Sequence, residues 1–187
     1  DLGTDKITGY PFDASKEKPV NENAIETNAK PGAGPRHIVF HESKPLAYVI
    51  EELSGYVSAY HFQNGKLELL QTINAHPADF KGNIGSAAIK ISADGKYLYA
   101  SNRGTSNTIA EFAIEPASGK LTLKEIKKTE GDSPRDFTIS PSGKYLLSTN
   151  SKSSSVVIFK RNTATGALEN SPAQVAIPEP VCLVFAK

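Results

Sequence analysis

Short runs rich in apolar and β-branched residues alternate with polar turn segments along the whole chain. The clearest stretch contains four such runs, at residues 88–91, 97–101, 108–114 and 121–126. Asp94-Gly95, between the first two runs, is typical of a tight hairpin turn. Runs of about four to eight residues that are bounded by Gly, Asp, Asn and Pro are typical of β-strands. The stretch therefore predicts four short antiparallel strands joined by turns.

The same four-strand pattern occurs three times. Equivalent apolar positions of the first strands are Phe40, Ile91 and Ile139, which are 51 and 48 residues apart. The second and third copies share the sequence Ser-x-x-Gly-Lys-Tyr-Leu, at residues 92–98 and 140–146. Four strands repeated every ~40–50 residues are typical of a β-propeller, in which each repeat forms one blade. A sandwich of short strands would have turns at a similar spacing but no such repeat.

The predicted fold class is all-β, a β-propeller of four-stranded antiparallel blades. The chain forms one partial domain, 1–187, with two strands in 1–33, blades at about 34–85, 86–132 and 133–179, and a final strand in 180–187. That final strand is the apolar segment Val181–Phe185, which aligns with the first strands of the blades. A propeller removes its open sheet edges by closing into a ring. We therefore expect a missing N-terminal half, or another chain, to complete the ring.

Composition narrows the classes of partner. Apolar residues make up 39% and charged residues 22%, with a mean hydropathy of −0.33, which is typical of a globular domain. The formal net charge of +1 provides no strongly basic field for nucleic acid or an anionic membrane. The single cysteine, Cys182, excludes an internal disulfide framework, and the histidines lack the spacing of metal ligands. The sequence predicts a cytoplasmic protein that binds no metal, nucleic acid or membrane.

Charged residues gather where each predicted blade meets the central channel. The loop into the first strand and the loop after the second strand lie on the same face of a blade. The residues at these positions are Arg36-His37, Ala87-Ala88 and Arg135-Asp136 before the first strands, and Glu51-Glu52, Asn102-Arg103 and Asn150-Ser151 after the second. Structural positions should repeat in every blade, and no charged residue at these positions is repeated in all three copies. Charge at a channel mouth is unfavourable unless it is paired or used.

These residue types point to a site for a small anionic substrate. Arginine binds phosphate or carboxylate with two parallel donors, and a carboxylate or imidazole can remove a proton. The predicted catalytic residues are Glu52, His37, Arg36 and Arg103; the predicted substrate-binding residues are Arg135, Asn102 and Glu51. The alternative is a ring of structural ion pairs between blades, such as Glu52 with Arg103.

The same residues carry a resemblance to a known family. Its motifs here are Asp1–Lys6, Gly34-Pro35-Arg36-His37, Tyr99–Arg103, Ser133-Pro134-Arg135 and Pro180–Phe185. In this order they resemble the C-terminal half of the seven-bladed propeller lactonase family. That family includes bacterial 6-phosphogluconolactonases of the propeller type and fungal carboxy-muconate lactonizing enzymes.

The resemblance implies cofactor-free chemistry on a small anionic lactone at the propeller mouth. It assigns arginine and histidine roles to Arg36 and His37, an acidic role to Glu52, and arginine roles to Arg103 and Arg135. The leading hypothesis is hydrolysis of a sugar lactone of the 6-phosphogluconolactonase type. The alternatives are a muconate-type lactonizing cycloisomerase and a non-catalytic binding module. The last is favoured by Ala88 and Lys90, which stand where the family usually has an acidic residue and a histidine.

Overall fold

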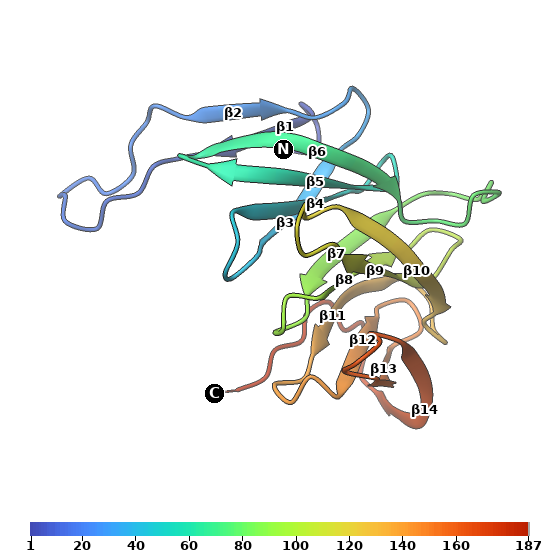
Figure 1. Ribbon diagram of the computed structural model, residues 1–187. Helices are drawn as coiled ribbons and strands as arrows, with labels where there is room; N and C mark the ends of the chain where they lie inside the picture. The colour runs from blue at the N-terminus through green and yellow to red at the C-terminus, as the bar shows by residue number, and fades with distance from the viewer. Residues whose placement is uncertain (187) are drawn as a thin grey trace.

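The chain folds into a row of antiparallel sheets. The computed structural model describes residues 1–186, and this range contains strands and no helix. Three sheets have four strands each, and a fourth, at the N-terminal end, has two. Figure 1 shows the sheets following one another in chain order, from blue at the N-terminus to red at the C-terminus. The predicted all-β class with four-stranded blades is confirmed.

Within each sheet the strands pair in the order in which they occur in the chain. The two-stranded sheet contains β1 (Lys6–Gly9) and β2 (Ile25–Asn28). The first blade contains β3 (Pro35–Phe40), β4 (Leu46–Glu51), β5 (Tyr56–Gln63) and β6 (Lys66–Asn74). The second blade contains β7 (Ser86–Ile91), β8 (Tyr97–Asn102), β9 (Thr108–Ile114) and β10 (Leu121–Lys128). The third blade contains β11 (Pro134–Ile139), β12 (Tyr145–Asn150), β13 (Ser155–Arg161) and β14 (Leu168–Ala176).

The core lies between neighbouring blades. Its largest fully buried side chains include Tyr48, Tyr99 and Phe112, which come from the second and third strands of their blades. The Tyr48 hydroxyl donates to the Gly119 carbonyl at 2.9 Å, and the Tyr99 hydroxyl donates to the Gly166 carbonyl at 2.6 Å. Each bond joins a second strand to the turn before the last strand of the next blade. Repeated tyrosines therefore fix the spacing of the blades.

The expected final strand is not a strand over the described part of 180–187. Residues 180–186 make no ladder hydrogen bonds, although the Leu183 amide donates to Asp136 Oδ2, on β11, at 3.3 Å. Cys182 and Phe185 are exposed, so this segment is not core. A strand exists only through its pairing, and none of the described strands pairs with this segment. Residue 187 lies outside the described residues.

Candidate functional site

Three pairs of strand ends meet at one end of the blades. In each blade the first residue of the first strand pairs with the last residue of the second, at Pro35 with Glu51, Ser86 with Asn102, and Pro134 with Asn150. The loops that precede the first strands and follow the second strands therefore share one face, as the sequence predicts. We call this face the upper face and the opposite one the lower face.

A β-bulge follows each of these pairs. The register shifts between Pro35 and His37, between Ser86 and Ile89, and between Pro134 and Asp136. In the first and third blades the residue left without a cross-strand partner is an arginine, Arg36 or Arg135. Bulges bend a strand and redirect the side chain of the extra residue. The side chains of Arg36 and Arg135 therefore need not follow the alternation of side chains between the two faces of the sheet.

Glu52 joins two arginines from neighbouring blades. Its Oε2 lies 2.8 Å from Arg36 Nε, and its Oε1 lies 2.8 Å from Arg103 Nη2. Arg36 Nη1 also donates to the Ala87 carbonyl at 2.7 Å, and Arg103 Nε donates to the Gly85 carbonyl at 3.1 Å. Glu52 and Arg103 thus form the inter-blade ion pair that the alternative of structural ion pairs predicts. We call these three residues the Arg–Glu–Arg cluster.

The cluster keeps donors available. Within residues 1–186, Arg36 Nη2 and Arg103 Nη1 have no hydrogen-bond or ion-pair partner, and neither atom is sealed from solvent. The side chains of Arg36, Glu52 and Arg103 are 16%, 24% and 17% exposed. The salt bridges therefore hold the guanidinium groups in place while one terminal nitrogen of each remains able to bind an anion.

Positive charge is crowded around Arg36. Burial lowers the pKa of Arg36, the charges of Arg103 and Arg135 lower it further, and Glu52 opposes the shift. Burial also lowers the pKa of His37, with Arg36 adding to the effect and Asp136 opposing it. The lowered pKa of His37 favours its neutral imidazole at pH 7. An added anion would relieve the repulsion among these groups.

A cavity of about 360 Å³ adjoins the cluster. Its lining includes Arg36, His37, Lys90, Arg135 and Asp136, together with part of the C-terminal segment. We call it the basic cavity, because its three cationic side chains outnumber the one carboxylate. Lys90 Nζ lies 3.4 Å from Asp136 Oδ1 across the boundary between the second and third blades. The predicted residues Arg36, His37 and Arg135 are thus brought together, with Glu52 and Arg103 beside them.

Two of the predicted substrate-binding residues, Asn102 and Glu51, are buried and make hydrogen bonds to other residues of the protein. Asn102 is fully buried; its amide donates to the Ala75 carbonyl at 2.7 Å, and its carbonyl accepts from Ser86 at 2.7 Å. Glu51 is 4% exposed and accepts from the hydroxyls of Ser54 and Ser58, each at 2.6 Å. Both side chains have their polar atoms occupied within and between the blades. These bonds help to hold the loops that carry Glu52 and Arg103, and a substrate-binding role for Asn102 and Glu51 stays a prediction.

Comparison with known proteins decides the family. Residues 1–185 match the model of the family described as "Lactonase, 7-bladed beta-propeller". The chain belongs to this family. The predicted relationship is therefore confirmed on nearly the whole length of the chain.

Several relatives within the lactonase family are similar over the whole chain. A 6-phosphogluconolactonase of Bacillus subtilis is 39% identical over 99% of this chain and 52% of its own length, and one of Formosa agariphila is 41% identical over 95% and 50%. The structure of a periplasmic gluconolactonase of Pseudomonas aeruginosa, PpgL, aligns with a TM-score of 0.94 and 37% identity, over 100% of this chain and 52% of that chain. The chain thus spans about half the length of these relatives.

Asp136 is not among the site residues predicted from the sequence of this lactonase-family chain. Lys90 appears there only as a departure from the family pattern. The sequence did contain a signal for Lys90. Residues two positions apart in a strand lie on the same face, so Lys90 is expected on the same face as Ala88, which lies at the channel mouth. The pairing with Asp136 depends on contact between blades 46 residues apart in the chain, which no local pattern reveals.

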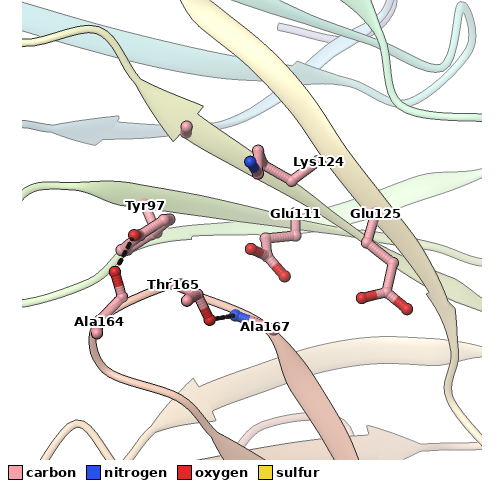
Figure 2. Close-up of a pocket in the computed structure, with 8 residues that line it drawn as sticks. Tyr97, Glu111, Lys124, Glu125, Ala164, Thr165 and Ala167 are labelled. Carbon is pink, nitrogen blue, oxygen red and sulfur yellow. Dashed lines mark hydrogen bonds between the residues drawn. The ribbon is translucent and has the colours of Figure 1, made fainter.

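A separate cleft lies towards the lower face. It has a volume of about 360 Å³ and is lined by residues that include Tyr97, Glu111, Lys124, Glu125 and Thr165. Figure 2 shows the carboxyl groups of Glu111 and Glu125 on one side of it, and the turn that carries Thr165 on another. Glu111 is 3% exposed, and burial together with the Glu125 charge raises its pKa to about 7. This cleft is not part of the Arg–Glu–Arg cluster.

Two absences complete the description of residues 1–186. We find no group of three or more His, Cys, Asp or Glu side chains arranged to hold a metal ion. Within the same range, no helix has the length and apolar character needed to cross a membrane.

Proposed function

We propose that this chain contributes the site of a lactone hydrolase that acts on a small anionic sugar lactone, of the 6-phosphogluconolactonase type. The observation that carries the proposal is the Arg–Glu–Arg cluster beside the basic cavity. Two guanidinium groups with free donors, a carboxylate and a neutral imidazole form a setting for opening an anionic ester ring. Relatives named 6-phosphogluconolactonase and gluconolactonase support this assignment.

In the proposed reaction Glu52 activates water. Its two oxygens each accept one arginine donor, which leaves further lone pairs for a water molecule. The water loses a proton to Glu52 as its oxygen bonds to the lactone carbonyl carbon, and the carbonyl electrons move to oxygen. The ring C–O bond then breaks, and the departing oxygen takes the proton from Glu52. The product is an open hydroxy acid, and atoms and charge balance.

The arginines stabilise the charge that develops in this step. Arg36 Nη2 and Arg103 Nη1 are donors already held in position, and donors fixed before the reaction stabilise a tetrahedral oxyanion most effectively. His37 lines the basic cavity, where we expect it to contact the substrate hydroxyls, and its Nε2 lies 3.1 Å from Arg36 Nη1. Arg135, redirected by its bulge, is placed to bind the anionic group of the substrate.

The proposed site lies at the mouth of a ring that this chain completes only in part. We propose that the remaining N-terminal half of the protein, or another chain, closes the ring. The chain's span of about half of its relatives supports this. The absence of nucleic-acid binding stays a prediction, as does a cytoplasmic location, since one relative is named as periplasmic.

An assay of acid release tests the proposed function. The full-length protein is mixed with 6-phosphogluconolactone at a pH where spontaneous hydrolysis is slow, and acid release is followed. We expect acceleration that is proportional to enzyme concentration. No acceleration would reject lactone hydrolysis of this type. A muconate lactone assay would then separate the cycloisomerase alternative from a non-catalytic binding module.

A further inference from the structure

Lys90 lines the basic cavity, and its Nζ lies 6.0 Å from the centroid of the Phe137 ring. It lies on β7 of the second blade, and its side chain is 34% exposed. Its one ionic contact within residues 1–186 is Asp136, at 3.4 Å, and no hydrogen bond of its Nζ is found in that range. Charge-assisted hydrogen bonds are typically about 2.7–2.9 Å long. Lys90 is therefore held near Asp136 but keeps its ammonium donors available.

The cations of the site fall into two groups. Arg36 and Arg103 share the carboxylate of Glu52 and are oriented by it. Arg135 has no ion pair or side-chain hydrogen bond within the described residues, and it lines the basic cavity together with Lys90. Lys90 and Arg135 therefore make fewer and longer polar contacts with the protein than Arg36 and Arg103 do. Lys90 and Arg135 come from neighbouring blades and face the same space.

The charges act on one another across this space. Arg135 contributes to lowering the pKa of Arg36, and Lys90 contributes to lowering that of His37, which means that all four groups share one electrostatic environment. Asp136 is the one carboxylate that lines the cavity, and its Oδ2 already accepts the Leu183 amide. A phosphate monoester carries about two negative charges at pH 7 and three strong acceptor oxygens, so it competes effectively with one carboxylate for Lys90.

We propose that Lys90, together with Arg135, binds a phosphate group on the substrate at a distance from the lactone carbonyl, and that Lys90 is therefore a specificity-determining residue. This inference rests on the proposed function. It divides the site into the Arg–Glu–Arg cluster, which acts on the lactone ring, and a Lys90–Arg135 pair, which selects phosphorylated lactones. Asp136 positions Lys90 before the substrate binds.

Two lactones that differ only by the phosphate test this division. The full-length protein, Lys90→Met and Lys90→Arg are assayed with 6-phosphogluconolactone and with gluconolactone. For Lys90→Met we expect kcat/KM on the phosphorylated lactone to fall by about 10- to 100-fold, mainly through KM, because one charge-assisted contact is lost. On gluconolactone we expect a change of less than about threefold, and Lys90→Arg should restore most of the discrimination. The exposed Lys144→Met is the matched control and should change neither activity.

The outcomes separate this inference from the proposed function. An equal loss on both lactones, or no loss on either, would overturn the role of Lys90 while leaving lactone hydrolysis intact. If the unmodified protein hydrolyses neither lactone, the proposed function fails. Calorimetric titration with 6-phosphogluconate and with gluconate then still tests Lys90. We expect Lys90→Met to weaken binding of the first by at least tenfold and not that of the second, and equal effects would overturn the inference.

Discussion

The charged side chains that differ between blades are concentrated at two kinds of position. One kind is the extra residue of a bulge, as Arg36 is, or the residue directly after a second strand on the upper face, as Glu52 is. The other is a core position that has become charged. Glu111, on the third strand of the second blade, lies opposite Tyr99 of the second strand. The equivalent third-strand residues in the first and third blades are apolar, Ala59 and Ile158. A residue that breaks the repeat has a local energetic consequence that can be measured.

Replacing Arg36 with alanine should remove most lactonase activity while the protein stays folded. One oxyanion donor typically contributes about 10²–10³-fold in rate. The ion pair with Glu52 and the bond to the Ala87 carbonyl are lost as well, so the free energy of unfolding should fall by about 1 kcal/mol. An assay of acid release with a denaturant titration measures both effects.

Leu98→Ala is the control for Arg36→Ala. Leu98 is fully buried in the core between the first and second blades, so its truncation should lower the free energy of unfolding by about 2–5 kcal/mol. The folded fraction should keep its activity. If Arg36→Ala keeps full activity, or loses it only by unfolding, the cluster is a structural ion-pair network.

Glu111 should make stability depend on pH. Its pKa is raised from 4.5 to about 7 in the folded protein, so the folded state binds the proton more tightly than the unfolded state. Stability should therefore fall as the pH rises from about 4.5 to about 7, by up to about 3 kcal/mol. Glu125, Arg161 and Lys124 are the other charges acting on this carboxyl group.

Glu111→Gln tests this dependence. Denaturant titrations at pH 5 and pH 8 should show the variant gaining stability relative to the original protein at the higher pH. The two proteins should differ less at pH 5, where the folded original carries a protonated Glu111. Parallel pH profiles for the two proteins would show that Glu111 is ionised over the whole range.

At the scale of strands and turns, the blade is built from repeated contacts that the sequence reveals in part. Turn glycines and alternating apolar residues identify all four strands of the second blade from local pattern alone. The place of Asn102 at the end of a predicted second strand, at the channel mouth, predicts a substrate-binding residue. The third blade has Asn150 at the equivalent place. The side-chain amide of Asn102 donates to the Ala75 carbonyl and that of Asn150 to the Thr129 carbonyl, each just after the last strand of the preceding blade. The same contact in two blades indicates a structural role for this Asn, and its repetition in the sequence was a signal of that role.

Other features could not be predicted from local pattern. The bulges at the start of β3, β7 and β11 depend on register, which is set when two strands pair. The segment 181–185 has the composition of a strand, but strand formation needs a partner that the described residues do not provide. The contact between Lys90 and Asp136 likewise depends on how adjacent blades pack.

The repeated tyrosines provide a matched pair of variants. Tyr48→Phe removes one hydrogen bond, to the Gly119 carbonyl, and should lower the free energy of unfolding by about 1 kcal/mol. Tyr99 donates to the Gly166 carbonyl and also accepts from Arg161 Nε at 2.7 Å, and Arg161 is 5% exposed. Tyr99→Phe should therefore have a larger effect, about 2–3 kcal/mol, because it leaves a buried charged donor unpaired. Equal losses in thermal or denaturant unfolding would show that Arg161 finds another partner.

At the scale of the whole molecule, the arrangement of blades explains why the site is shared. The Arg–Glu–Arg cluster joins the first and second blades, and the basic cavity is completed by the third. The site therefore depends on the relative placement of blades more than on any single one. Family membership and the span of about half of each relative support the proposal that these blades are part of a larger ring.

Residues 1–187 expressed alone should behave differently from the full-length protein. Large apolar side chains such as Phe12, Phe40 and Val184 are exposed, at 69%, 48% and 79%. Exposed apolar patches and open sheet edges favour association. We expect light scattering to show self-association of the isolated chain and a monodisperse full-length protein. A monomeric isolated chain with the same Tm as the full-length protein would contradict ring completion.

The central claim is that Arg36, Glu52, Arg103 and Arg135 surround one bound anion on the upper face. A crystal structure of the full-length protein with 6-phosphogluconate, the product of the proposed reaction, tests it most directly. We predict that the product carboxylate contacts Arg36 Nη2 and Arg103 Nη1, and that the phosphate lies between Lys90 and Arg135. Product bound elsewhere, with the Arg–Glu–Arg cluster untouched, would contradict the account.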